Sequence, residues 1–124
     1  MLHWFRVLLT AVGLLAAVGL AIAAPLALKV DTALASFDEY GQPVVNIRLD
    51  EESARAFAGF TAENIGKVVE LRVDGEIVTA PMIRDTIAGG EIMISGSMTA
   101  EDAASLAMRL RGGGMIEVAV TEGQ

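Results

Sequence analysis

Hydrophobic and polar residues alternate most regularly between residues 67 and 79. From Val69 to Val73 every second side chain is apolar and the residues between are charged, as in a strand with one buried face. Asp74-Gly75 follows, and this dipeptide suits a two-residue hairpin turn because both central residues need a positive φ. The pattern therefore predicts a β-hairpin whose second strand covers residues 76–79.

Two other segments show the three-to-four-residue spacing of amphipathic helices. The first begins at Asp50, whose carboxylate can accept hydrogen bonds from the free amides of the first turn, and ends at Gly66, with two shorter helices as the alternative because Gly59 weakens the middle. The second begins at Thr99, which can form a capping box with Asp102, and ends at the glycines 112–114. The predicted buried side of this second helix consists of Ala103, Leu106, Ala107 and Leu110.

Apolar runs at residues 44–49, 91–96 and 115–120 predict three more strands. Residues 24–36 show no clean period and are predicted to form a linker or an edge segment. The resulting order of elements is that of an α+β domain of the ferredoxin-like type, a split βαβ arrangement with two helices on one face of an antiparallel sheet. We expect this domain to occupy residues 37–124.

The first 23 residues have the pattern of a targeting segment. Residues 7–23 form an apolar run, and Ala21-Ile22-Ala23 provides the small residues that a signal peptidase requires. The alternative is a retained membrane anchor, since the apolar run extends to Leu28 and approaches the roughly 20 residues that cross a bilayer. Both interpretations place the following domain in the periplasm, either soluble or tethered to the inner membrane, and a cytoplasmic location is the remaining alternative.

The charge balance disfavours one class of partner. The chain has 9 Lys and Arg against 16 Asp and Glu, a formal charge of −7, and removal of the segment that contains Arg6 makes this charge −8. An acidic surface repels phosphates, so we expect no binding of nucleic acid. The chain has no cysteine, so a domain outside the cytoplasm must depend on its apolar core rather than on disulfides.

Residues able to carry out catalysis are scarce. The single histidine is His3 in the leader, which together with the lack of cysteine excludes a Ser-His-Asp triad or a thiol nucleophile from the domain. Residues 50–52 could hold a cation and the glycines 112–114 an anion, but a helix start and a helix end explain them better. A hydrolase based on Asp74 or Glu76 is the remaining alternative, although the hairpin turn accounts for Asp74. We therefore predict no catalytic, cofactor-binding or metal-binding residue and no enzyme activity.

Methionines are numerous after the leader. Flexible filling of the core is the role we expect for them, and an adaptable surface for peptide contact is the alternative. They are Met82, Met93, Met98, Met108 and Met115.

A series of short motifs between residues 42 and 114 has a characteristic order and spacing. The motifs are Val45–Asp50, Phe57-Ala58, Thr61–Lys67, Val73–Gly75, Ala80-Pro81, Ile87–Gly90, Ile94–Gly96, Met98–Ala103 and Leu106–Gly113. Together they resemble the C-terminal part of the first periplasmic domain of SecD, a subunit of the bacterial Sec preprotein translocase. One departure from that family is Gly114-Met115-Ile116, which replaces the Ala-Leu-Pro that usually follows the last helix.

The resemblance implies a non-catalytic periplasmic module that binds polypeptide. SecD acts with SecF, and the pair uses the proton-motive force to complete the export of preproteins. By resemblance, the partners are exported polypeptide or components of the Sec translocase, with the inner membrane added if the leader is retained. Because the sequence predicts at most one membrane segment, we expect this chain not to provide the channel and the membrane carboxylates that proton coupling requires. The alternative function is a structural or assembly domain that docks on another envelope protein and is unrelated to export.

Overall fold

The computed structural model of the protein describes residues 25–121. The leader predicted at residues 1–23 lies outside this range, so its interpretation as a signal peptide or an anchor stays a prediction. Neither helix in the described range has the length and apolar composition needed to span a bilayer. The elements follow the order β1 (Leu26–Phe37), β2 (Pro43–Leu49), α2 (Glu51–Glu63), β3 (Val69–Val73), β4 (Glu76–Thr79), β5 (Glu91–Ile94), α3 (Ala100–Leu110) and β6 (Met115–Val120).

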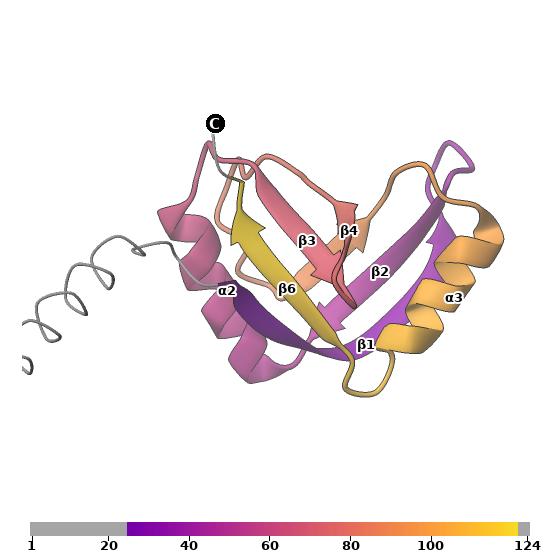
Figure 1. Ribbon diagram of the computed structural model, residues 1–124, viewed down its shortest axis with the longest axis horizontal. Helices are drawn as coiled ribbons and strands as arrows, with labels where there is room; N and C mark the ends of the chain where they lie inside the picture. Colours follow the sequence, from indigo (N-terminus) through magenta and orange to yellow (C-terminus); the bar gives the residue numbers. More distant parts are fainter. Residues whose placement is uncertain (1–24, 122–124) are drawn as a thin grey trace, which may run out of the picture.

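A curled sheet of six strands organises the fold (Figure 1). Its strands follow the order β4-β3-β6-β1-β2-β5, and every neighbouring pair is antiparallel. Buried residues alternate with more exposed ones along the strands, so the sheet has one apolar face, which we call the inner face. The buried sides of α2 and α3 belong to the same core cluster as this inner face.

The predicted α+β class, with two helices and an antiparallel sheet, is confirmed, but the ferredoxin-like topology is wrong. A βαβ unit joins two parallel strands through a helix. Here α2 joins β2 to β3. In the sheet β1 and β6 lie between these two strands, so three antiparallel pairings lead from β2 to β3. They therefore run in opposite directions, and the same holds for β5 and β6 on either side of α3.

The linker or edge segment predicted at residues 24–36 is also wrong, because this segment forms most of β1 in the middle of the sheet. Residues 26–29 pair with β6 and residues 30–37 pair with β2. A bulge at Asp31 lies just after this change of partner, since Val30 lies opposite Leu49 and Thr32 lies opposite Arg48. A bulge adds one residue and shifts the alternation of buried and exposed positions, which explains why the sequence shows no period there.

The core combines the inner face of the sheet with one side of each helix. The predicted buried side of α3 is confirmed, because Ala103, Leu106, Ala107 and Leu110 are all buried. In α2 the buried residues include Phe57 and Thr61. Thr61 also fastens the loop before β5, since its hydroxyl oxygen accepts a hydrogen bond of 2.9 Å from the amide of Ile87. Each apolar side chain that is fully buried contributes roughly 1.5–3 kcal/mol to stability.

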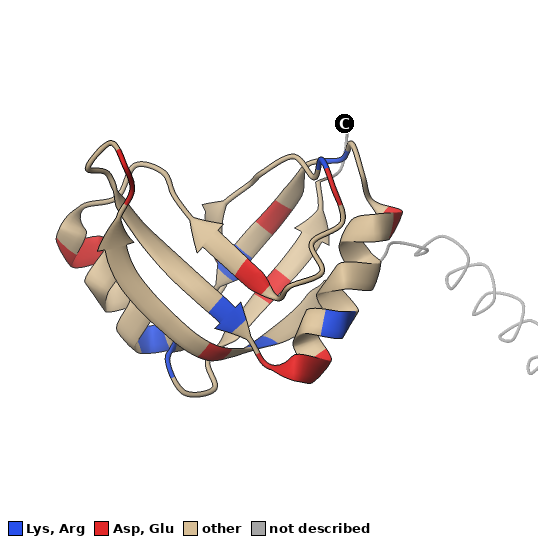
Figure 2. Cartoon of the chain, turned by 180° about the vertical axis from the view of Figure 1, so that it is seen from behind, with Lys and Arg blue, Asp and Glu red and all other residues tan. Residues whose placement is uncertain are grey.

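The local signals in the sequence agree with the structure. Asp74 and Gly75 have φ angles of 53° and 83°, as a two-residue turn between β3 and β4 requires. Thr99 and Asp102 form the predicted capping box at the start of α3. The first turn of α2 is acidic (Figure 2), which suits the positive end of the helix dipole. The predicted hairpin and both predicted helix starts are therefore confirmed.

Two glycines give a test of the packing. A Cβ at Gly114, where α3 leads into β6, would lie 2.6 Å from Leu110 Cα and 2.7 Å from Leu110 O, and backbone atoms cannot move aside easily. A Cβ at Gly59 within α2 would meet nothing within 4 Å. We expect Gly114→Ala to lower the free energy of unfolding by about 1–3 kcal/mol. Gly59→Ala should raise it by about 0.5–1 kcal/mol, because alanine is the better helix former.

Urea denaturation of the purified variants measures both changes. Gly59→Ala is the matched control, since it adds the same methyl group in open space. Unchanged stability of the Gly114→Ala variant would contradict the close approach of β6 and the end of α3.

Candidate functional site

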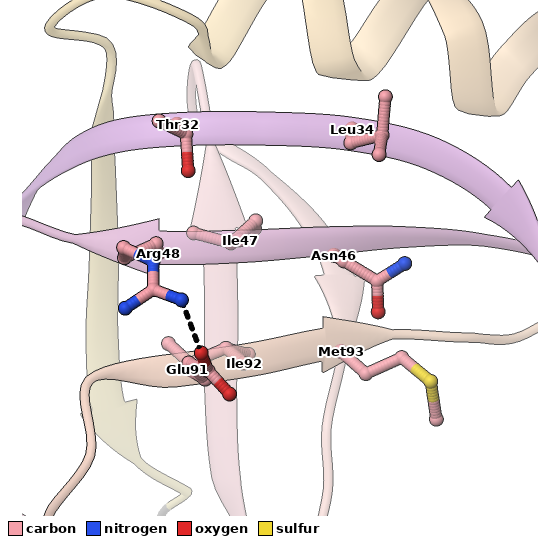
Figure 3. Close-up of a pocket in the computed structure, with 8 residues that line it drawn as sticks. All are labelled: Thr32, Leu34, Asn46, Ile47, Arg48, Glu91, Ile92 and Met93. Atoms are coloured by element: carbon pink, nitrogen blue, oxygen red, sulfur yellow. Dashed lines mark hydrogen bonds and ion pairs between the residues drawn. The ribbon is translucent and has the colours of Figure 1, made fainter.

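The face of β1, β2 and β5 that is turned away from the core forms an open groove of about 480 Å³ (Figure 3). We call it the outer face. Its side chains come from alternate positions of the three strands, opposite in direction to the buried positions. They are Thr32, Leu34, Asn46, Arg48, Glu91 and Met93.

The outer face has two rows of side chains that run across the strands. In the first row Leu34 lies opposite Asn46, which lies opposite Met93. Leu34 and Met93 are 62% and 56% exposed, so the row presents two apolar side chains around a central amide. Residues directly opposite each other on neighbouring strands share a face and are close enough to interact. The row is therefore a continuous surface that one bound chain could contact.

The second row carries an ion pair. The Arg48 guanidinium donates to Glu91 Oε2 at 2.6 Å, and Thr32 lies opposite Arg48. Both charged side chains are more than half exposed, so the pair contributes little to stability. It neutralises the single charged side chain of β5, and it thereby leaves this end of the groove without net charge.

The outer face has the chemistry of a contact surface. Within residues 25–121 no group of three or more His, Cys, Asp or Glu side chains could hold a metal ion. The two charged groups on the face are paired with each other, and the remaining side chains are apolar, hydroxyl or amide. Such a surface can bury apolar area and exchange hydrogen bonds with a partner, and it offers no evident nucleophile with an adjacent base.

The carboxylates considered in the sequence lie elsewhere and have structural partners. Asp74 at the hairpin tip accepts a hydrogen bond of 3.0 Å from Arg109 of α3 and so joins the hairpin to the helix. Glu51 faces Arg55 at 3.9 Å along α2, and both side chains are largely exposed. Asp50 accepts a hydrogen bond of 2.8 Å from the amide of Ser53, as a helix cap does.

Hydrogen bonds at the start of α2 lower the pKa of Asp50. The largest cause is the bond from the backbone amide of Ser53, and the side chain of Ser53 adds to it. Desolvation opposes these bonds and raises the pKa, while the positive charges of Lys29 and Arg55 have still smaller effects that lower it. The pKa of Asp50 therefore lies below its ordinary value of 3.8, because the charged form is the better acceptor.

The methionines are mostly at the surface, so core filling is the wrong interpretation for four of the five. Met82, Met93, Met108 and Met115 are between 48% and 71% exposed, while Met98 packs partly buried against the core. Of these, Met93 lines the outer face and Met115 lines a second groove beside the hairpin and α3. Their exposure is compatible with the alternative role, contact with a flexible partner.

Sequence reasoning did not find the outer face. This face needs β1 beside β2, whereas the sequence pattern predicts a linker or an edge segment in place of β1. The signal that could have found it is the apolar alternation of Ala33 and Ala35 after Asp31, which places Leu34 on the opposite side. That alternation is visible only when the shift at the bulge is allowed for.

Residues 27–116 match the protein family described as the P1 head subdomain of SecDF. The chain is 42% identical to the protein translocase subunit SecD of Acidaminococcus fermentans over 81 residues, which are 65% of this chain and 19% of that protein. It is 40% identical to the subunit SecDF of Thermus thermophilus over 83 residues, which are 67% of this chain and 11% of that protein. A solved structure of SecDF, a membrane component that enhances protein export, has a TM-score of 0.66 and 36% identity and covers 77% of this chain and 44% of its own. The chain thus spans about a fifth or less of these two relatives.

The hydrogen bonds at Asp50 predict a pH dependence of stability. The pKa of Asp50 is lower in the folded chain than its ordinary value of 3.8, so its stabilising contribution is present above that pH. The contribution is lost as the pH falls through the folded value. Asp50→Asn keeps an amide cap and removes the titration. We expect the stability difference between wild type and this variant to shrink as the pH is lowered from about 5 to about 2.5.

Urea midpoints of the two proteins across this pH range measure the difference. The variant serves as the control for all the other carboxylates, because these titrate in both proteins. A difference that stays constant with pH would contradict the lowered pKa.

Proposed function

The chain belongs to the SecDF family as a P1 head subdomain, and from this we propose that it is a non-catalytic periplasmic binding domain of protein export that contacts exported polypeptide. The resemblance to SecD stated from the sequence is confirmed. Family membership supports a role related to protein export, while the partner and the place of contact are part of the proposal. Components of the Sec translocase are the second class of partner that the family favours.

The outer face is the observation that carries this proposal. It joins an open groove of about 480 Å³ with two exposed apolar side chains, Leu34 and Met93, and with the amide of Asn46 between them. Unfolded polypeptides expose apolar side chains together with unpaired backbone groups, and this surface can accept both. A methionine thioether adapts to side chains of different shape, which suits a partner of variable sequence.

The test is site-specific crosslinking during export. A photoreactive amino acid replaces Met93 in one variant and Met115 in another, in cells that export a tagged reporter protein arrested partway through the membrane. Both side chains are about half exposed, and Met115 lines the second groove, so it is the matched control. We expect adducts with the arrested reporter from position 93, few from position 115, and none when export of the reporter is blocked.

Two outcomes contradict the proposal. Equal labelling from both positions would show that contact is not specific to the outer face. Labelling of one envelope protein from position 93, unchanged when export is blocked, would favour the assembly domain that docks on an envelope protein.

The periplasmic location has its own test. If residues 1–23 are a signal peptide, the protein isolated from the cell envelope begins at Ala24, after the small residues Ala21 and Ala23. N-terminal sequencing of that protein gives the answer directly. A sequence that begins at Met1 in the membrane fraction would show a tethered form instead, and recovery from the cytosol would contradict the location.

A further inference from the structure

β5 is an edge strand with little protection. The sheet ends at β4 on one side and at β5 on the other. The pairing of β4 with β3 contains a register shift, and Pro81 follows soon after β4, so that edge has two of the features that prevent further pairing. The pairing of β5 with β2 has no such shift, and β5 contains no proline. Within residues 25–121, β5 is therefore the flatter of the two terminal edges.

The hydrogen-bond pattern shows which backbone groups of β5 are free to pair. The amide of Leu49 donates to Gly90 O at 2.8 Å, which identifies this pair as hydrogen-bonded. Hydrogen-bonded and non-hydrogen-bonded pairs alternate along an antiparallel ladder. Ile92 therefore bonds to β2, whereas the N–H and C=O groups of Glu91 and Met93 point away from β2, toward the open edge.

The side chains at this edge do not oppose an added strand. Charged side chains commonly prevent edge pairing, and Glu91 is the single charged residue of β5. Its carboxylate is already paired with Arg48 at 2.6 Å on the outer face. Met93, the other residue whose backbone faces the edge, has an exposed apolar side chain on the same face.

We propose that an extended segment of an unfolded polypeptide adds to β5 as a seventh strand and hydrogen-bonds to the backbone of Glu91 and Met93. This inference rests on the proposed function and specifies its site. Main-chain hydrogen bonds provide the affinity in such complexes, and alternate side chains provide the preference. The side chains of the residues opposite Glu91 and Met93 lie on the outer face, so an apolar residue is preferred beside Met93.

The charge of the protein selects this occupant over a second copy of the chain. The chain has a formal charge of −7, so two copies repel each other when their edges approach. An uncharged or basic unfolded segment has no such repulsion. Two residues with free backbone groups give a short contact, so we expect binding that is weak and reversible.

The experiment uses a fluorescein-labelled octapeptide, Ser-Val-Thr-Val-Lys-Val-Thr-Ser, and the purified protein, with binding measured by fluorescence anisotropy. Two further peptides carry N-methyl groups either on the valines or on the residues between them. N-methylation removes a donor from one edge of an extended peptide and leaves the other edge intact. We expect methylated valines to weaken binding roughly five- to tenfold and the other methylation to change it less than about twofold.

Two protein variants test the other side of the contact. Met93→Pro removes an N–H that β2 does not use, and Met93→Leu is the control that keeps this N–H while it also removes the methionine. We expect Met93→Pro to bind the unmodified peptide roughly five- to tenfold more weakly than Met93→Leu does, because the two variants lack the same methionine and differ in the backbone N–H. Urea denaturation shows whether Met93→Pro is folded, and the peptide series decides the question if it is not.

The possible results separate this inference from the proposed function. If both methylated peptides bind as tightly as the unmodified peptide, or if both bind more weakly by the same factor, strand addition is overturned while polypeptide binding stands. Absence of binding by all three peptides, with no crosslink from position 93 to an arrested reporter, overturns both.

Discussion

The fold depends on one strand, β1, that belongs to two ladders. Its first four residues pair with β6, the residues from Val30 onward pair with β2, and the bulge at Asp31 lies just after this change of partner. Near the bulge β1 has backbone groups that no strand satisfies, and buried groups of this kind must find partners. The start of α2 supplies them at Lys29, whose amide donates to Ser53 Oγ at 2.8 Å and whose carbonyl accepts from the amide of Asp50 at 3.0 Å. The end of α3 supplies one at Ala33, whose carbonyl accepts from Arg111 Nε. Both helices are thus fixed to β1 by their ends as well as by their apolar sides.

This arrangement explains why the outer face and the edge of β5 remain open. Both helices cover the inner face, because that is where the apolar positions of all the strands lie. The ladders that β1 joins leave β5 at one end of the sheet and β4 at the other. The bend in β1 curls the sheet, as bulges do, and the outer side of β1, β2 and β5 carries a groove. The proposed binding surface therefore follows from how the core is closed.

The sequence was informative wherever a structure is determined by neighbouring residues. The turn at Asp74-Gly75 and the capping box at Thr99 each depend on a few consecutive positions, and both were predicted correctly. Strand order depends on contacts between distant segments, so the predicted ferredoxin-like arrangement of the strands was wrong even though most strands were found. β1 was missed for a local reason, since the extra residue at Asp31 breaks the period that identifies strands. The outer face was missed with it, because a surface made by three strands needs the third strand in place.

An open edge of β-sheet is useful for binding unfolded chains, and for the same reason it is hazardous. Main-chain pairing does not depend on sequence, so an edge that accepts one extended polypeptide accepts others, including another copy of the same domain. The edge must bind unfolded polypeptide and must not bind other copies of the chain. These two requirements conflict only if nothing distinguishes a copy of the chain from its partners. Net charge provides that distinction here, since repulsion grows with the charges of both molecules and a chain of −7 repels its own copies more than it repels a neutral segment. The ion pair of Arg48 and Glu91 has a local effect of the same kind, because it neutralises the charge of Glu91 beside the edge of β5 while the net charge of the chain stays negative. Under the proposed strand addition, the acidic composition therefore limits pairing between copies of the chain at the edge that the fold leaves open.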